Sequence, residues 1–81
     1  MTLQNSEVGK YYQVTSLKMA GKLLRRLQAL GLTKDTEIKV LNRKTSGSVI
    51  FSVRGTRLAV GKKIAEDIEI KETVQGGYDY E

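Results

Sequence analysis

Residues 22–40 read KLLRRLQALGLTKDTEIKV, and the spacing of the apolar residues changes partway through this run. A helical period joins four leucines, which are Leu23, Leu24, Leu27 and Leu30. Their single stripe predicts a short amphipathic helix over residues 22–30. Gly31 follows the last leucine, where a left-handed C-terminal cap favours a residue without Cβ, and Leu32 is expected to pack back onto the helix end. From Thr36 the period becomes two, which predicts a strand.

Other runs with a period of two predict further strands. Residues 11–17, YYQVTSL, are rich in aromatic and β-branched side chains and predict a first strand ahead of the helix. Residues 49–54 predict another strand, and Arg54-Gly55-Thr56 predicts a tight hairpin turn into a partner strand that contains Leu58 and Val60. Ile64 and Ala65 indicate one helical turn before a last strand around residues 68–70.

About five short strands, with one helix between the first and the second, predict a mainly β fold that closes into a small barrel. Residues 1–7 are interpreted as a polar lead-in. Residues 73–81 include Gly76-Gly77 and lack apolar periodicity, so they are expected to be a mobile tail. No linker or repeat divides the chain, and residues 1–72 are therefore predicted to form one domain.

The composition excludes several classes of site. The 81 residues include no cysteine and no histidine. Thiol nucleophiles, thiolate metal ligands and the commonest general base are therefore absent, and we expect neither catalytic residues nor an enzyme. No run approaches the ~20 apolar residues that span a bilayer. The first seven residues lack a signal-peptide pattern, so we expect a cytoplasmic protein that does not insert into the membrane.

Positive charge is concentrated in the first half of the chain. The net charge is +5, and residues 17–44 carry eight basic and two acidic residues. Such a segment is either a solvated helix face or a surface for an acidic partner. Arginine is enriched at the centres of protein interfaces, which favours the helix and the hairpin turn as contact elements. The predicted partner-binding residues are Lys22, Arg25, Arg26, Arg54 and Arg57.

The alternative interpretation is a small barrel that binds nucleic acid. Its phosphate-contacting patch would consist of Lys22, Arg25, Arg26, Lys34, Lys39, Arg43 and Lys44. Barrels of this kind also need aromatic side chains on which bases stack, and the predicted core region offers only Tyr11, Tyr12 and Phe51. Phe51 shares a strand face with two valines and is expected in the core. Nucleic acid therefore ranks second to protein as a partner.

A third hypothesis is weak metal binding. Without histidine or cysteine, any site must use oxygen ligands, which suit hard cations and hold Fe(II) or another divalent metal weakly. The candidate ligands are Asp35, Glu37 and the acids between Glu66 and Glu72. No cofactor is required for a binding role, and the sequence assigns no residue firmly to a metal.

Several segments, in this order and at these spacings, resemble the FeoA family, the small accessory proteins of bacterial ferrous iron uptake. They are Gly9 with Tyr12 to Leu17, Arg25-Arg26-Leu27, Leu30-Gly31-Leu32, Ile38-Lys39-Val40, Val53-Arg54-Gly55, Leu58-Ala59-Val60 and Ala65-Glu66-Asp67-Ile68. The resemblance covers about residues 8–71. It departs from the family at Thr33-Lys34-Asp35-Thr36, where the family usually has a Pro-Gly pair.

The resemblance implies an SH3-like barrel, in which Leu27, Leu30, Gly31, Leu32 and Gly55 occupy structural motif positions. It also implies a cytoplasmic role without enzymatic activity, in which the protein binds and modulates the membrane transporter FeoB through that transporter's cytoplasmic part. The chain looks like the stand-alone form of the domain.

Overall fold

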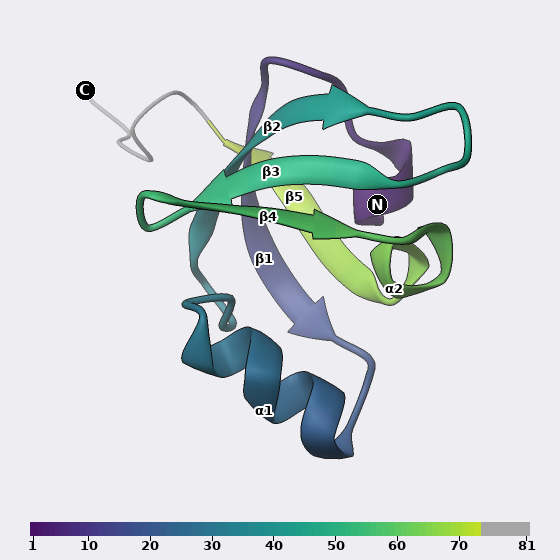
Figure 1. Cartoon of the computed structure of the whole chain (residues 1–81). Coiled ribbons are helices and arrows are strands. Elements are labelled where there is room, and N and C mark those ends of the chain that lie inside the picture. The colour runs from purple at the N-terminus through teal and green to yellow at the C-terminus, as the bar shows by residue number, and fades with distance from the viewer. Residues whose placement is uncertain (74–81) are drawn as a thin grey trace, which may run out of the picture.

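Residues 1–73 are described by the computed structural model of this protein, which contains five strands, two α-helices and one 3-10 helix in this range (Figure 1). In chain order the elements are η1 (Leu3–Asn5), β1 (Tyr11–Leu17), α1 (Gly21–Ala29), β2 (Glu37–Arg43), β3 (Val49–Val53), β4 (Thr56–Val60), α2 (Lys62–Glu66) and β5 (Ile68–Thr73). The prediction of five strands with one helix between the first two is confirmed.

The strands form one antiparallel sheet in the order β4-β3-β2-β1-β5. The sheet curls strongly, so that β5 passes behind β3 and β4 (Figure 1). Two register shifts contribute to this curvature, one between Val14 and Ser16 in β1 and one between Val40 and Asn42 in β2. A bulge bends its strand and increases the local twist, which allows so few strands to wrap around a core.

The core lies on the inner face of this curled sheet, as the period of two predicts. In β3, Val49, Phe51 and Val53 are fully buried, while Ile50 and Ser52 are partly exposed. Phe51 is thus a core residue, as expected. The other strands add buried side chains at alternate positions, which are Tyr12 and Val14, Ile38 and Val40, Val60, and Ile68 and Ile70.

Helix α1 docks on the sheet through fewer leucines than its stripe predicts. Leu27 is 6% exposed and Leu23 is partly buried against the core, whereas Leu30 is 43% exposed. The expectation that Leu30 belongs to the buried stripe is wrong, because the helix ends at Ala29 and Leu30 is its C-cap. Leu32, which is fully buried beyond the cap, contributes the apolar side chain at this end of the helix instead.

The segment before β1 is not the polar lead-in that the sequence suggests. Leu3 is fully buried in the core, and the Ser6 hydroxyl, also buried, donates a hydrogen bond of 2.7 Å to the Leu3 carbonyl. The Ile70 amide donates to the Met1 carbonyl (2.8 Å), so the start of the chain lies along β5. A single apolar side chain among polar neighbours has no periodicity, which is why the pattern does not reveal this anchor.

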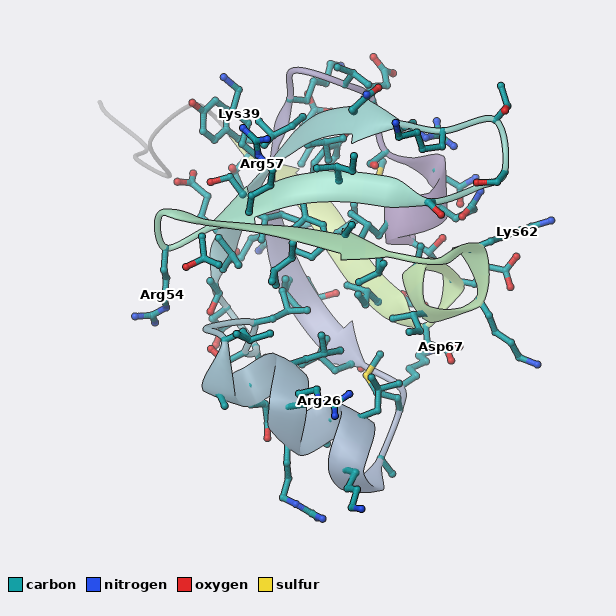
Figure 2. The ribbon with its side chains drawn as sticks, viewed as in Figure 1. Arg26, Lys39, Arg54, Arg57, Lys62 and Asp67 are labelled. Atoms are coloured by element: carbon teal, nitrogen blue, oxygen red, sulfur yellow. The ribbon has the colours of Figure 1, made fainter. Side chains whose placement is uncertain are left out.

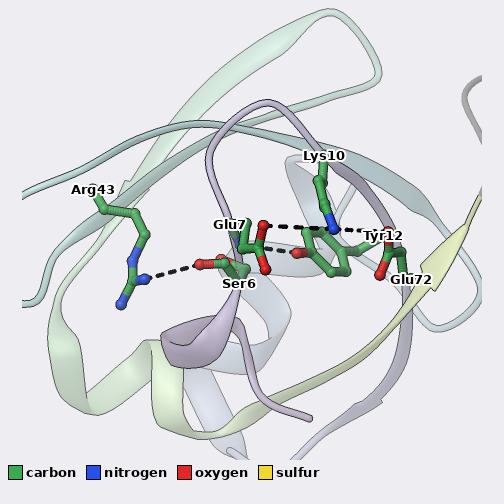
Figure 3. Close-up of polar contacts among 6 residues, drawn as sticks. All are labelled: Ser6, Glu7, Lys10, Tyr12, Arg43 and Glu72. Carbon is green, nitrogen blue, oxygen red and sulfur yellow. Dashed lines mark hydrogen bonds and ion pairs between the residues drawn. The ribbon is translucent and has the colours of Figure 1, made fainter.

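Polar contacts from Arg43 and Tyr12 also hold the segment before β1 in place (Figure 3). The Arg43 guanidinium donates to the Ser6 carbonyl (2.9 Å) and to the Gln4 carbonyl. The Glu7 amide donates to the buried Tyr12 hydroxyl (2.8 Å). Arg43 and Tyr12, both considered for nucleic-acid binding, therefore serve the fold.

At the C-terminal end, β5 continues to Thr73, one residue into the segment expected as a tail. Thr73 pairs with Tyr11, and its hydroxyl donates to the Glu37 carboxylate (3.4 Å). The rest of that segment, residues 74–81, lies outside the described residues. In residues 1–73, no helix has the length and apolar character needed to cross a bilayer.

Candidate protein-interaction site

The helix α1 presents three of the predicted cations. Lys22, Arg25 and Arg26 are all exposed, and none forms an ion pair with a carboxylate of residues 1–73. Lys22 and Arg26 are four residues apart and are neighbours on the helix surface, where like charges are mildly destabilising. A helix that keeps three adjacent cations without acidic partners in the described chain offers an uncompensated positive surface.

The end of α1 has the geometry that the sequence predicts. The Leu32 amide donates to the Leu27 carbonyl (3.0 Å), and the Gly31 amide donates to the Gln28 carbonyl (3.0 Å). Together with a φ of +104° at Gly31, these two bonds form a Schellman motif. The glycine cap is confirmed, and it reverses the chain so that Leu32 enters the core.

Gly31 also makes room for an arginine from a distant part of the chain. A Cβ on Gly31 would lie 2.9 Å from Cδ of Arg54, closer than carbon atoms normally approach. The aliphatic part of the Arg54 side chain therefore packs directly over Gly31, although Arg54 as a whole is exposed to solvent. This contact joins the β3–β4 turn to the C-terminal end of α1, and it brings two of the predicted elements into one site.

The turn that carries Arg54 holds it in an unusual backbone conformation. Val53 pairs with Thr56, which leaves Arg54 and Gly55 as a two-residue loop with φ values of +50° and +79°. Positive φ at both positions is characteristic of a type I′ turn, which usually begins with asparagine, aspartate or glycine. For arginine, the left-handed conformation costs about 1–2 kcal/mol. Such strain, at an exposed cation, is typical of functional positions.

Arg57 lies on a different surface, the outer face of the sheet. Ser52 pairs with both Lys39 and Arg57, so the three residues form a row across β2, β3 and β4 (Figure 2). The Lys39 Nζ atom lies 5.4 Å from the centre of the Tyr11 ring, a cation–π contact. Tyr11 is thus on the outer face, not in the core.

A shallow pocket with a volume of about 190 Å³ connects the outer face with the turn. Its walls are formed by Tyr11, Glu37, Ile38, Lys39, Ser52 and Arg54. Arg54 is the shared residue, because it lines the pocket and also covers Gly31. The candidate interaction site therefore runs from the cations of α1 across Arg54 to Lys39 and Arg57. Sequence spacing does not reveal Lys39 and Tyr11 as a pair, because their contact depends on the β1–β2 register.

The seven-cation patch of the nucleic-acid interpretation is divided in the structure. Arg43 donates to main-chain carbonyls of the first segment, and Lys39 faces Tyr11. Tyr12 and Phe51 are buried, which leaves Tyr11 as the aromatic residue of the predicted set that a base could reach. This arrangement of cations and aromatic side chains does not favour nucleic acid over protein as the binding partner.

The acids of the metal hypothesis are dispersed, and two of them, Glu69 and Glu72, form ion pairs with lysines. Glu72 lies 3.3 Å and Glu7 3.5 Å from Nζ of Lys10 (Figure 3), and Glu69 lies 3.3 Å from Nζ of Lys18. The hydrogen bond that Lys10 donates to the Glu72 carboxylate and the negative charge of Glu7 raise the pKa of Lys10 above its ordinary value. In the described part of the chain, no three carboxylates gather where they could hold one ion.

Comparison with known proteins identifies the domain. The FeoA domain pattern matches residues 1–72, nearly the whole chain. The chain belongs to the FeoA family. The expectation that it is not an enzyme agrees with membership of this family of transport accessory proteins.

Three relatives illustrate the match. A Methanocaldococcus jannaschii protein assigned as an Fe(2+) transport protein A is 32% identical over 54 residues, which is 67% of this chain and 65% of that protein, slightly under two thirds of its length. The crystal structure of an iron uptake regulatory protein, FeoA, superposes with a TM-score of 0.75 at 30% identity, covering 89% of this chain and 96% of that chain. FeoA from Stenotrophomonas maltophilia, crystallised with zinc and described as an SH3 domain protein, gives 0.71 at 22%, covering 88% and 89%. The SH3-like fold is thereby confirmed.

Proposed function

We propose that this FeoA-family protein is a cytoplasmic accessory of ferrous iron transport that binds the cytoplasmic part of the transporter FeoB and modulates it. Membership of the FeoA family supports the role in ferrous iron transport. The observation that carries the binding role is Arg54, an exposed cation held at positive φ and packed over Gly31 beside a helix with three further cations. An arginine aimed in this way, with no acidic partner in residues 1–73, suits an acidic surface on the transporter.

Iron is the cargo of the transporter in this proposal. Direct binding of Fe(II) to this chain is expected to be weak, because within residues 1–73 no three carboxylates gather around one position, and Glu69 and Glu72 already pair with lysines. The accessory role rests on contact with the transporter and does not need a metal bound here.

Replacing Arg25 and Arg26 together with glutamine is expected to weaken binding to the cytoplasmic domains of FeoB by about tenfold or more. Most of the loss should appear in the association rate and should shrink as salt is raised, because exposed charges act mainly by steering. Titration calorimetry or biolayer interferometry against the purified domains, with and without guanine nucleotide, measures the effect.

A charge-matched control separates the site from general electrostatics. Lys44→Gln together with Lys71→Gln removes the same charge at two exposed positions outside the site. We expect this control to lose much less affinity than the arginine double variant. Equal losses in the two variants, or no binding of the unmodified chain in any nucleotide state, would contradict direct recognition by α1. Tighter binding to RNA or DNA than to the transporter domains would favour the nucleic-acid interpretation instead.

A further inference from the structure

The two edges of the sheet are protected to different degrees. At β5, the first residues of the chain cover the edge, with Thr2 bridged to Glu69 and the Ile70 amide bonded to the Met1 carbonyl (2.8 Å). At the other edge, β4 pairs with β3 alone, and within residues 1–73 no further strand joins it (Figure 1). An uncovered edge presents unpaired amides and carbonyls, which natural proteins normally blunt.

The hairpin fixes which groups of β4 point outward. Val53 and Thr56 close the two-residue loop, so their amides and carbonyls bond to each other. Hydrogen-bonded and non-hydrogen-bonded pairs alternate from that point along an antiparallel ladder. The amides and carbonyls of Arg57 and Ala59 therefore face away from β3. Both residues are exposed, and neither main chain takes part in a turn or loop hydrogen bond within residues 1–73.

The charges around this edge have one sign. Residues 54–63 read RGTRLAVGKK, with four cations and no acid. Arg54 and Lys62 lie beyond opposite ends of β4 and both extend away from the domain, while the side chain of Arg57, on β4, lies on the outer face beside Lys39 (Figure 2). None of the four cations forms an ion pair with a carboxylate of the described chain. The edge is thus an open strand template bordered by positive charge.

We propose that the free edge of β4 binds an extended, acidic segment of a partner protein, which adds to the sheet as a sixth strand. Its main chain would bond to the outward groups of Arg57 and Ala59, and its carboxylates would pair with Arg54, Arg57, Lys62 and Lys63. Strand addition of this kind takes its affinity from main-chain bonds and its specificity from side chains. The inference goes beyond the proposed function, because it names a recognition mode that does not depend on FeoB being the partner.

Charge decides against a second copy of this chain as the occupant. Two β4 strands side by side would bring four cations from each copy to a shared edge, and like charges placed across strands destabilise the pairing. An acidic segment removes this repulsion and replaces it with attraction. Charge complementarity therefore selects an acidic strand over self-association.

The test uses the full chain, labelled with ¹⁵N, and a synthetic peptide of alternating glutamate and valine or threonine as the probe. Addition of this peptide is expected to shift the amide resonances of Arg57 and Ala59 and to slow their hydrogen exchange at least tenfold, because both amides gain a partner. A peptide with lysine in place of each glutamate is expected not to bind. Absence of any change at the two amides on saturation with the acidic peptide would overturn the proposal.

Two substitutions at Ala59 make the test specific to the main chain. Ala59→Pro removes the outward amide at a position where an edge strand tolerates proline, and Ala59→Thr keeps that amide with a good strand former. We expect the proline variant to bind the peptide about tenfold more weakly than the threonine variant. Equal affinities would overturn the proposal. If the proline variant does not fold, the exchange measurement on the unmodified chain remains decisive. Slow exchange of both amides before peptide is added would also overturn it, because the edge would already be occupied.

Discussion

Leu3→Ala is expected to destabilise the domain by about 2–5 kcal/mol, although Leu3 lies in a segment that the sequence presents as polar. The side chain is fully buried in the core, and its removal leaves a cavity between the first segment and the sheet. The free energy of unfolding of a native protein is about 5–15 kcal/mol, so this one substitution is expected to remove a large part of it. Urea denaturation followed by circular dichroism measures the loss as a lower midpoint.

Val8→Ala is the matched control for this prediction. Val8 belongs to the same segment but is 55% exposed, so its truncation is expected to change the free energy of unfolding by less than about 0.5 kcal/mol. Equal stability of the Leu3 and Val8 variants would show that the first segment contributes nothing to the core.

Gly31→Ala is expected to destabilise the domain by about 1–3 kcal/mol and to weaken partner binding as well. The backbone at Gly31 has φ +104°, which L side chains rarely adopt, and the new Cβ would lie 2.9 Å from Cδ of Arg54. Arg54 must therefore move, and the helix end and the turn lose their contact. Thermal unfolding measures the stability cost, and titration of the FeoB cytoplasmic domains measures the loss of affinity.

Gly9→Ala separates strain from contact. Gly9 has a similar φ of +91°, but no atom lies within 4 Å of the position that a Cβ would take. Gly9→Ala and Gly31→Ala should both lower the free energy of unfolding, because each places an alanine at positive φ. Gly31→Ala alone should displace Arg54 and weaken binding. A Gly9→Ala variant that lost as much affinity would contradict a specific role for the Arg54 contact. The excess cost at Gly31 should disappear in an Arg54→Ala background, as a double-mutant cycle would detect.

The elements with a clear period could be predicted from the sequence. Alternation around Phe51 placed it in the core, and the glycine after the leucine stripe marked the end of α1. The hairpin at Arg54-Gly55 also follows from local turn chemistry. These features depend on neighbours along the chain, which the sequence displays directly.

Features that depend on distant contacts could not be predicted in this way. Leu3 is buried because the start of the chain lies along β5, and Leu30 is exposed because the helix stops one residue earlier than its stripe. In the candidate site, the helix and hairpin cations were predicted as one set. The structure keeps Arg54 with the helix, packed over Gly31, but separates Arg57 from it, on the outer face in one row with Lys39. Only the sheet register reveals that division.

The position of β5 in the sheet has a consequence for how the protein is made. β1 lies between β2 and β5, and Tyr11 pairs with Thr73 near the far end of the described chain. Contacts so distant in sequence form slowly, and this one cannot form until the last strand has left the ribosome. The domain therefore completes its fold only after nearly all of its residues have been translated. In a nascent chain that stalls before β5, the edge of β1 that β5 would cover stays unpaired and available to chaperones.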